Sequence, residues 1–254
     1  MHRTTADLPA PTARSVAGQS IAVQGMRLNV LSGFELVHRG AAVPLPLSVQ
    51  RIIALLALHG RPLQRVYVAG VLWINSSEAH ANASLRTTLW RTNGVAKSIV
   101  QARGQWIGLV PGVDIDLREA TGCADRALGD RGTTSDDLAI LSRAGDVLPD
   151  WYEDWVVIER ERFRQLRLHA LERLCETLAA DRRFAEATSA GLSAIAGEPL
   201  RESAHRVLIA AYLAEGNVGE ALRHYRLFAR LLHRQLQLRP SPQMNELMAP
   251  VYQR

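Results

Sequence analysis

Residues 83–93 read Ala83-Ser-Leu-Arg-Thr-Thr-Leu-Trp-Arg-Thr-Asn93, a stretch with the residue spacing of an amphipathic helix. At about 100° per residue, one side of this helix carries leucines and threonines: Leu85, Thr88, Leu89 and Thr92. The opposite side carries arginines, a threonine and a tryptophan: Arg86, Thr87, Trp90 and Arg91. A thin apolar seam under such a face suits a DNA major groove, where Arg pairs with guanine and with phosphate. Taken alone, a solvated helix face with incidental arginines explains the same pattern.

A β-hairpin is predicted directly after this helix. Two β-rich runs, Ser98-Ile-Val-Gln-Ala102 and Gln105-Trp-Ile-Gly-Leu-Val110, flank a tight turn at Arg103-Gly104. Asn93-Gly94 is predicted to end the helix, because glycine readily adopts the left-handed conformation of a helix cap. A hairpin in this position corresponds to the wing of a winged helix, and it places Arg103 at the tip, within reach of a minor groove or a phosphate.

The residues that precede the helix predict a small sheet and two further helices. Apolar runs separated by Ser32-Gly33 and Arg39-Gly40 predict antiparallel strands at 26–31, 34–38 and 43–47, with Pro44 and Pro46 marking an edge strand. A helix is predicted from an N-cap at Ser48 to a stop at His59-Gly60, and Pro62 opens a second helix. A polar loop at 75–78 leads into the third helix, at about 83–93. Sheet, three helices and hairpin in this order predict a winged helix-turn-helix domain.

The charge of the chain is divided unevenly between its halves. The 254 residues carry a formal net charge of +5, with 47% apolar and 22% charged residues, as expected for a chain with a real core. From Met1 to Gly112 there are 11 basic and 3 acidic side chains, a net of +8, whereas the remainder has 19 basic and 22 acidic, a net of −3. A basic module joined to a near-neutral one indicates nucleic acid as the partner of the first. Of the 30 basic residues, 29 are Arg, and this preference is not interpreted as functional, because a high genomic GC content produces the same bias.

The second half predicts an all-α, tetratricopeptide-like domain. No strand is predicted from Asp114 onward; helices are predicted from Asp116, from Asp136 and at about 155–180. A spacing of 34 residues relates Leu174 to Leu208, Leu178 to Tyr212, and Glu186-Ala187 to Glu220-Ala221, with turns at Asp181 and at Gly216-Asn217. A helix-turn-helix period of 34 residues is the tetratricopeptide pattern. The predicted domains are therefore a disordered leader (1–24), a winged helix (25–112) and the helical domain (113–254).

No catalytic motif is found, and the sequence predicts a protein that is not an enzyme. Phosphate-loop, dinucleotide, zinc-protease and nucleophile-elbow motifs are absent, and neither a cofactor nor a metal is expected. The pair Asp114/Asp116 is interpreted as helix capping, and the helical histidines, His205 and His224 among them, as surface or half-buried residues. Arginines 160, 162, 164 and 167 are interpreted mainly as solvated ion pairs, with a phosphate contact as the alternative. Two isolated cysteines, no signal peptide and no membrane-length apolar run indicate a cytoplasmic protein.

Three stretches resemble the Streptomyces antibiotic regulatory proteins. Residues 148–174, which begin Leu148-Pro-Asp-Trp-Tyr-Glu-Asp-Trp155, and Glu198-Pro-Leu-Arg-Glu-Ser-Ala-His-Arg206 resemble the bacterial transcriptional activator domain of that family. The segment Ser84-Leu-Arg-Thr-Thr-Leu-Trp-Arg91 resembles the recognition helix of its OmpR-like winged helix. The resemblance implies an activator that binds promoter direct repeats and recruits RNA polymerase holoenzyme, often for secondary metabolism and antibiotic biosynthesis.

The expected site is a DNA interface on double-stranded promoter DNA. Its residues lie on the third helix, at the wing and before the second helix: Ser84, Arg86, Thr87, Trp90, Arg91, Arg103, Arg61 and Arg65. Direct repeats require a second copy of the chain beside the first. The alternative is a helical-repeat scaffold for protein partners, in which the winged helix is degenerate and forms only a dimer surface.

Overall fold

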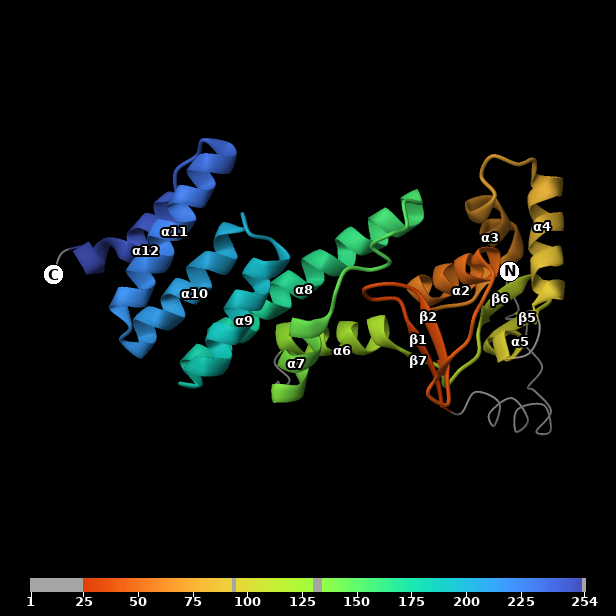
Figure 1. The fold of residues 1–254 in the computed structure, drawn as a ribbon, viewed down its shortest axis with the longest axis horizontal. Helices are drawn as coiled ribbons and strands as arrows, with labels where there is room; N and C mark the ends of the chain where they lie inside the picture. The colour runs from red at the N-terminus through yellow and green to blue at the C-terminus, as the bar shows by residue number, and fades with distance from the viewer. Residues whose placement is uncertain (1–24, 93–94, 130–133, 253–254) are drawn as a thin grey trace, which may run out of the picture. The chain divides into compact units, whose positions relative to one another are not determined.

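The computed structural model describes residues 25–92, 95–129 and 134–252, so the predicted leader and the predicted cap at Asn93-Gly94 lie outside the described residues. The chain forms two units, each with its own core (Figure 1). The first contains the described residues up to Arg118 together with Leu148–Val156, and the second contains Glu119–Val147 and the residues from Val157 onward. A region with a small sheet thus precedes a mostly helical region, and this order of the two regions was predicted from the sequence.

The first unit begins with a sheet of short strands. Strand β1 (Met26–Asn29) pairs antiparallel with β2 (Glu35–His38), which pairs antiparallel with β3 (Ala41–Ala42). Between β2 and β3, Arg39 and Gly40 both have positive φ, of 52° and 82°, which is the requirement of a two-residue hairpin turn. On the other side β1 pairs in parallel with β7 (Asp114–Ile115). The prediction of no strand from Asp114 onward is therefore wrong, because a two-residue strand is too short to show a period.

The predicted third strand at 43–47 is also wrong. The tight turn at Arg39-Gly40 places Ala41 and Ala42 opposite His38 and Val37, so the third strand ends before Val43. Prolines 44 and 46 cannot donate to a ladder, and helix α2 (Leu47–His59) begins directly after Pro46. Its N-cap is Pro46 rather than Ser48 and has no side-chain cap bond. The predicted stop is confirmed, since Gly60 has a φ of 64° and its N–H bonds to Leu56 O.

Further helices follow α2 in the first unit. A two-residue strand, β4 (Leu63–Gln64), precedes α3 (Arg65–Leu72), so the second helix begins three residues after the predicted Pro62. Helix α4 (Glu78–Arg91) lies beside α3 and begins five residues before the predicted 83 (Figure 1). Helix α5 (Val95–Ile99) was not predicted, because the β-rich composition around it gives no helical period.

The predicted hairpin is present. Strand β5 (Val100–Arg103) pairs antiparallel with β6 (Trp106–Leu109), so it begins two residues later than predicted, where α5 ends. Strand β4 pairs with the other edge of β6, through Leu63 opposite Ile107 and Gln64 opposite Trp106. This register ties the start of α3 to the hairpin. A core of buried residues from α2, α3, α4 and β6 holds these elements together: Ile52, Leu55, Leu56, Leu63, Val68, Ala69, Leu72, Ala81, Leu85 and Ile107.

One carboxylate closes the first sheet. Asp116 accepts hydrogen bonds from the backbone N–H of Val30 (2.9 Å), Leu31 (2.9 Å) and Leu117 (2.7 Å) at the start of helix α6 (Asp116–Leu128). Burial raises the pKa of this carboxyl, and the backbone N–H bonds oppose that rise. Asp116 therefore serves the fold: it accepts from one N–H at the start of α6, and its other bonds join that start to the end of β1 rather than cap the helix.

The second unit consists of helices that follow one another along the chain. Its elements are α6, α7 (Ser135–Arg143), α8 (Asp154–Ala180), α9 (Phe184–Gly197), α10 (Glu202–Glu215), α11 (Val218–Leu236) and α12 (Pro242–Tyr252). Helix α7 starts with a capping box between Thr134 and Asp137. None of the helices that the structure describes combines the length and the apolar composition that crossing a bilayer needs.

The 34-residue period is visible in the turns. Arg182 and Gly216, which are 34 positions apart, both have positive φ, of 61° and 91°. The next residue in each turn bonds back in the same way, Arg183 N–H to Leu178 O and Asn217 N–H to Tyr212 O, both at 2.8 Å. Two helix hairpins, α8–α9 and α10–α11, are therefore closed by the same cap. Leu174 and Leu208, and Ala187 and Ala221, are all buried, as their repeat relationship requires.

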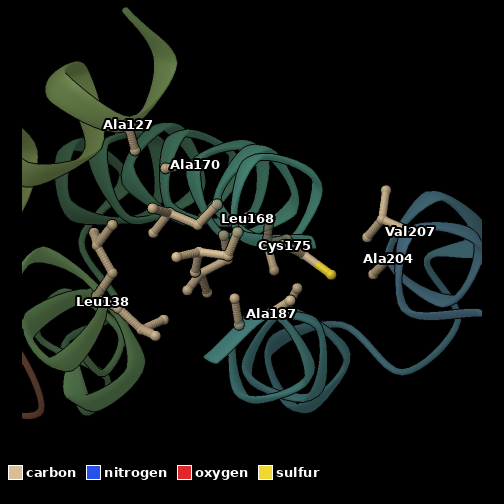
Figure 2. Packing of buried hydrophobic residues seen from close by; sticks show 14 of the residues in the cluster. Ala127, Leu138, Leu168, Ala170, Cys175, Ala187, Ala204 and Val207 are labelled. Atoms are coloured by element: carbon tan, nitrogen blue, oxygen red, sulfur yellow. The ribbon is translucent and has the colours of Figure 1, made fainter. Parts of the chain in front are cut away.

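Small residues allow the helices of the second unit to approach closely. Figure 2 shows part of this core, where Leu168 and Cys175 of α8 lie near Ala187 of α9 and Ala204 and Val207 of α10. Burial raises the pKa of Cys175 to about 12, so this thiol stays protonated. A second cluster joins α10, α11 and α12 around Phe228, Met244 and Met248.

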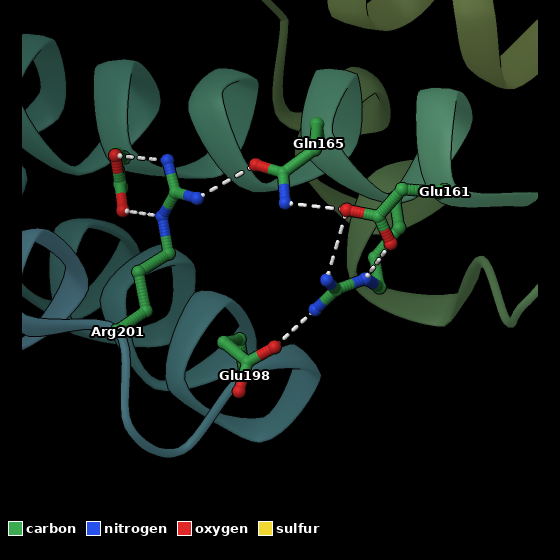
Figure 3. Close-up of polar contacts among 6 residues, drawn as sticks. Glu161, Gln165, Glu198 and Arg201 are labelled. Atoms are coloured by element: carbon green, nitrogen blue, oxygen red, sulfur yellow. Dashed lines mark hydrogen bonds and ion pairs between the residues drawn. The ribbon is translucent and has the colours of Figure 1, made fainter.

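The arginines of α8 are mostly not solvated, which corrects the prediction. Arg164 pairs with Glu161 and with Glu198, and Arg201, just before α10, binds Glu172 (2.6 Å) and Gln165 (2.9 Å), as Figure 3 shows. Arg167 is 9% exposed and donates to Leu141 O (2.7 Å), while Arg160 donates to Val147 O (2.7 Å). Only Arg162 of the four is largely exposed, at 80% of its side chain. These side chains hold helices together.

Candidate nucleic-acid interface

Helix α4 presents a basic face because its inner face is fixed to the core. Ser77 caps the helix by accepting from His80 N–H, and Ala81 and Leu85 are buried against α2 and α3. Since these positions define the inner side, the side chains on the opposite side are exposed: Arg86, Thr87, Trp90 and Arg91. Trp90 is the extreme case, with 82% of its surface exposed.

The end of α4 is held in place by Thr92. This residue is 6% exposed, its hydroxyl donates to Thr88 O (2.7 Å), and its N–H bonds to the same carbonyl (3.1 Å). Both bonds from Thr92 end on Thr88 O and tie the last turn of the helix to a buried residue. The C-terminal turn that carries Trp90 and Arg91 is therefore anchored on its inner side.

A groove of about 550 Å³ brings four cationic side chains together. They come from four different elements: Arg65 of α3, Arg86 of α4, Lys97 of α5 and Arg103 of β5. Among the described residues that line this groove, none is acidic. Four cations without counter-charges form a local positive potential that suits an anion such as a phosphate backbone.

Arg65 and Arg86 also line a second groove, of about 470 Å³, between α4 and the hairpin turn. Its other walls include Gln64, Asn82 and Gln105. The backbone N–H of Arg65 donates to Gln105 O (2.8 Å), which fixes the start of α3 against the hairpin. The buried Nε of Arg65 has no hydrogen-bond partner among the described residues. An unpaired buried donor is costly in free energy.

Arg91 lies toward the other side of α4. It lines one groove of about 540 Å³ with Leu89, Trp90 and Lys97. It lines another of about 400 Å³ with Thr87, Thr88 and residues 44–46 and 48–49. Basic side chains are therefore present on both flanks of the outer face.

The other residues predicted for the interface are Arg61, Ser84 and Arg103, and they differ in how near they lie to the exposed face of α4. Arg61 is exposed and donates weakly to Pro62 O (3.4 Å), and it does not line the grooves that contain Arg86. Ser84 is half-buried, away from the exposed face. Arg103 is exposed at the hairpin turn, where Gly104 has a φ of 56°.

Sequence reasoning missed Lys97 and Trp106. Lys97 shares two grooves with the arginines of α4, and the signal available was that it is the single lysine of the chain. Trp106 is 47% exposed and lies opposite Arg103 in the hairpin register. The alternation of side chains along the second hairpin strand placed Trp106 on one face of the hairpin. It did not show which of the two faces is exposed to solvent.

Other chemistry-bearing groups serve the core. His205 is fully buried rather than at the surface, and its Nδ1 lies 2.9 Å from His224 Nε2. Burial lowers the pKa of both, that of His224 to about 4 with further contributions from His205 and Arg223. Arg126 pairs with Asp137; burial alone would raise the pKa of Asp137, but hydrogen bonds from Arg126, Thr134 and Cys123 lower it to about 2. In the described part of the chain, no His, Cys, Asp and Glu side chains are grouped so as to hold a metal.

Comparison with known proteins gives the class of this chain. The family model described as the bacterial transcriptional activator domain matches residues 115–251. Regulatory protein AfsR of Streptomyces coelicolor is 29% identical over 215 residues, which cover 80% of this chain and 21% of AfsR. The chain thus spans about a fifth of the length of that relative. The structure of Mycobacterium tuberculosis EmbR in complex with a low affinity phosphopeptide is similar in fold, with a TM-score of 0.63 at 20% identity, over 90% of this chain and 65% of that chain.

The matched model covers more than half of the chain, and it describes a family of transcriptional regulators. The chain belongs to the bacterial transcriptional activator domain family and is a member of the Streptomyces antibiotic regulatory protein type, as its motifs indicated.

Proposed function

We propose that this regulator is a DNA-binding transcriptional activator whose first unit is a winged helix-turn-helix. In this proposal α4 is the recognition helix and enters the major groove with Arg86, Thr87, Trp90 and Arg91. The β5–β6 hairpin is the wing, with Arg103 on a phosphate or a minor groove.

The groove that contains Arg65, Arg86, Lys97 and Arg103 carries this proposal. Separate elements contribute these cations, and none of the described lining residues neutralises them. A solvated helix face with incidental arginines does not require convergence from α3, α4, α5 and β5. A phosphate strand that passes between α4 and the hairpin would contact all four side chains. Arg61 and Ser84 contribute at most from the edge of this interface.

The second unit supplies the contact with the transcription machinery in this proposal. Helix α11 exposes arginines and a leucine along its outer face: Arg226, Leu227, Arg230 and Arg234. Arginine next to exposed leucine suits a protein surface with acidic and apolar groups. We infer RNA polymerase holoenzyme as the partner, two copies of the chain on promoter direct repeats, and a secondary-metabolite gene cluster as the target.

Footprinting on the promoters beside the protein's own gene tests this function, with and without RNA polymerase holoenzyme. We expect protection of repeats spaced by about one helical turn, ~10.5 base pairs, and transcription in vitro that rises when the protein is added. Binding should weaken steeply with salt, as release of counterions requires. A full chain that shows no salt-sensitive protection of any duplex would refute the proposal.

The exposed face of α11 also favours a second candidate, a scaffold in which the helical repeats bind proteins and the winged helix only forms a dimer surface. Charge reversal separates the two functions. Under the scaffold hypothesis, Arg86→Glu with Arg91→Glu leaves function intact, whereas Arg226→Glu with Arg230→Glu abolishes it. Under the activator hypothesis, the α4 variant loses promoter protection and the α11 variant keeps it.

A further inference from the structure

Trp90 has no structural role that explains its position. It exposes 82% of its surface, and among the described residues of α4 it is the only large apolar side chain on the outer face. Leu85 is buried and Leu89 is half-buried on the inner side, so neither competes with it for that surface. A tryptophan held in water leaves a large apolar area unburied, which burial against a partner would remove.

The surroundings of Trp90 are cationic. Arg91 follows it in the helix, and both line a groove of about 540 Å³ together with Leu89 and Lys97. Thr87 lies one turn before it on the same exposed face. An apolar ring that shares a groove with Arg91 and Lys97 matches a surface on which an apolar group lies among phosphates.

We propose that Trp90 is a specificity determinant that contacts the 5-methyl group of one thymine in the major groove. This inference rests on the proposed DNA-binding function and names the base that α4 recognises at this position. In a stacked duplex the ring faces of the bases are covered, and the apolar group at the floor of the major groove is the thymine methyl. Apolar wedges between base steps are a device of minor-groove proteins, and the width of a helix suits the major groove instead.

Substitution of thymine by deoxyuridine tests the contact, because it removes one methyl and leaves every hydrogen bond of the base pair in place. The full chain is used to select its preferred duplex from a random library, and each thymine of that duplex is then replaced singly. For the unmodified protein we expect affinity to fall about fourfold at one position, the factor that corresponds to the loss of one methyl contact. For Trp90→Ala we expect weaker binding overall and no further loss at that position.

Three variants make the result specific. Trp90→Leu keeps an apolar contact and should retain part of the deoxyuridine effect. Trp106→Ala removes the other exposed tryptophan of this unit, on the hairpin, and should leave the effect unchanged. Thr87→Ser removes the methyl group of the exposed threonine one turn before Trp90, and it should also leave the effect unchanged. Thermal unfolding of Trp90→Ala should match that of the unmodified chain, because the side chain is exposed.

The outcomes separate this inference from the function on which it rests. If Trp90→Ala keeps the full deoxyuridine effect, or if the effect disappears in Thr87→Ser instead, the assignment to Trp90 is wrong while DNA binding stands. If Trp90→Ala binds every duplex as well as the unmodified chain, Trp90 does not face DNA. A full chain that selects no duplex at all refutes the DNA-binding function and this contact together.

Discussion

Arg51 Nε lies 2.8 Å from Glu153 Oε1, so α2 is paired with a segment that the chain reaches only after α6 and α7. The same guanidinium donates from Nη2 to Leu72 O (2.9 Å) at the end of α3. Two tryptophans of the same segment contribute as well: Trp151 stacks on Phe34 with ring centroids 5.9 Å apart, and Trp155 packs against the core cluster of α2, α3 and α4. The first unit is therefore complete only with Leu148–Val156.

Glu153→Ala should destabilise the first unit. The pair is partly exposed, with 24% and 29% of the two side chains accessible, so we expect the free energy of unfolding to fall by about 1 kcal/mol. Urea unfolding followed by circular dichroism measures this change. Asp150→Ala removes an exposed carboxylate of the same segment and should change the free energy by less than about 0.5 kcal/mol. Equal effects of the two substitutions would mean that the pair with Arg51 contributes nothing.

The contribution of Leu148–Val156 illustrates what the sequence could and could not predict. The aromatic cluster at Trp151 and Trp155 was visible, and so was the long helix that follows it. The packing of this segment against α2 could not be predicted. Periodicity reports which face of an element is apolar, but it does not report which distant element covers that face. The domain boundary predicted at Gly112 therefore stays a prediction. In the structure the first unit also includes Leu148–Val156, a segment that lies between two parts of the second unit along the chain.

The candidate interface was likewise predictable from the sequence only in part. Helical spacing predicted which α4 side chains are exposed, because the buried positions Ala81 and Leu85 fix that geometry. Lys97 could not be found in this way, since it reaches the groove from α5, a helix of five residues without a detectable period. Convergence of charges from several elements is a property of tertiary structure.

Arg86→Ala with Arg91→Ala should weaken binding to the footprinted duplex and make it less sensitive to salt. Each phosphate contact that is lost reduces the slope of log K against log salt by about 0.9, so the slope should fall by one to two such steps, ~0.9 to ~1.8. Fluorescence anisotropy between low and physiological salt measures it. Arg162→Ala, which removes an exposed arginine of α8, is the matched control and should leave the slope unchanged. An unchanged slope in the α4 variant would show that neither arginine contacts phosphate.

The pair His205–His224 should make the second unit sensitive to acid. His205 Nε2 lies 2.9 Å from Pro199 O, which can only accept, so His205 Nδ1 is free to accept from His224 Nε2–H. Burial lowers the pKa of both imidazoles below 6.5, that of His224 to about 4, although Glu202 opposes the shift at His205. The unfolded chain then binds more protons than the folded chain between pH 6.5 and about 4, so stability falls as the pH falls through that range.

Urea unfolding at pH 7 and pH 5 measures this loss, which we expect to reach about 2 kcal/mol for His224 at pH 5. His224→Gln keeps a donor toward His205 and should remove that part of the pH dependence. His169→Gln, an exposed histidine of α8, should leave the dependence as it is. If the His224→Gln chain loses as much stability on acidification as the unmodified chain, the pair is not the group that titrates.

Two glycines of the repeats should respond to alanine in opposite directions. Gly191 of α9 lies where a Cβ would be 3.1 Å from the Cβ and Cδ1 of Leu208 and 3.2 Å from Cys175 Sγ, so α9 can approach α8 and α10 only without a side chain there. Gly191→Ala forces this core to open, and we expect a loss of about 1–3 kcal/mol in the free energy of unfolding. A Cβ on Gly219 of α11 would meet no heavy atom within 4 Å apart from its chain neighbours and the backbone of its own helix, so Gly219→Ala should stabilise the chain by about 0.4–1 kcal/mol through the unfolded state. Thermal and urea unfolding of the two variants measure both effects on one protein. Both substitutions replace a helical glycine by alanine, so a loss at Gly191 beside a gain at Gly219 points to the helix–helix contact as the cause of the loss. A gain at both positions would show that the repeats are not packed as closely as this contact requires.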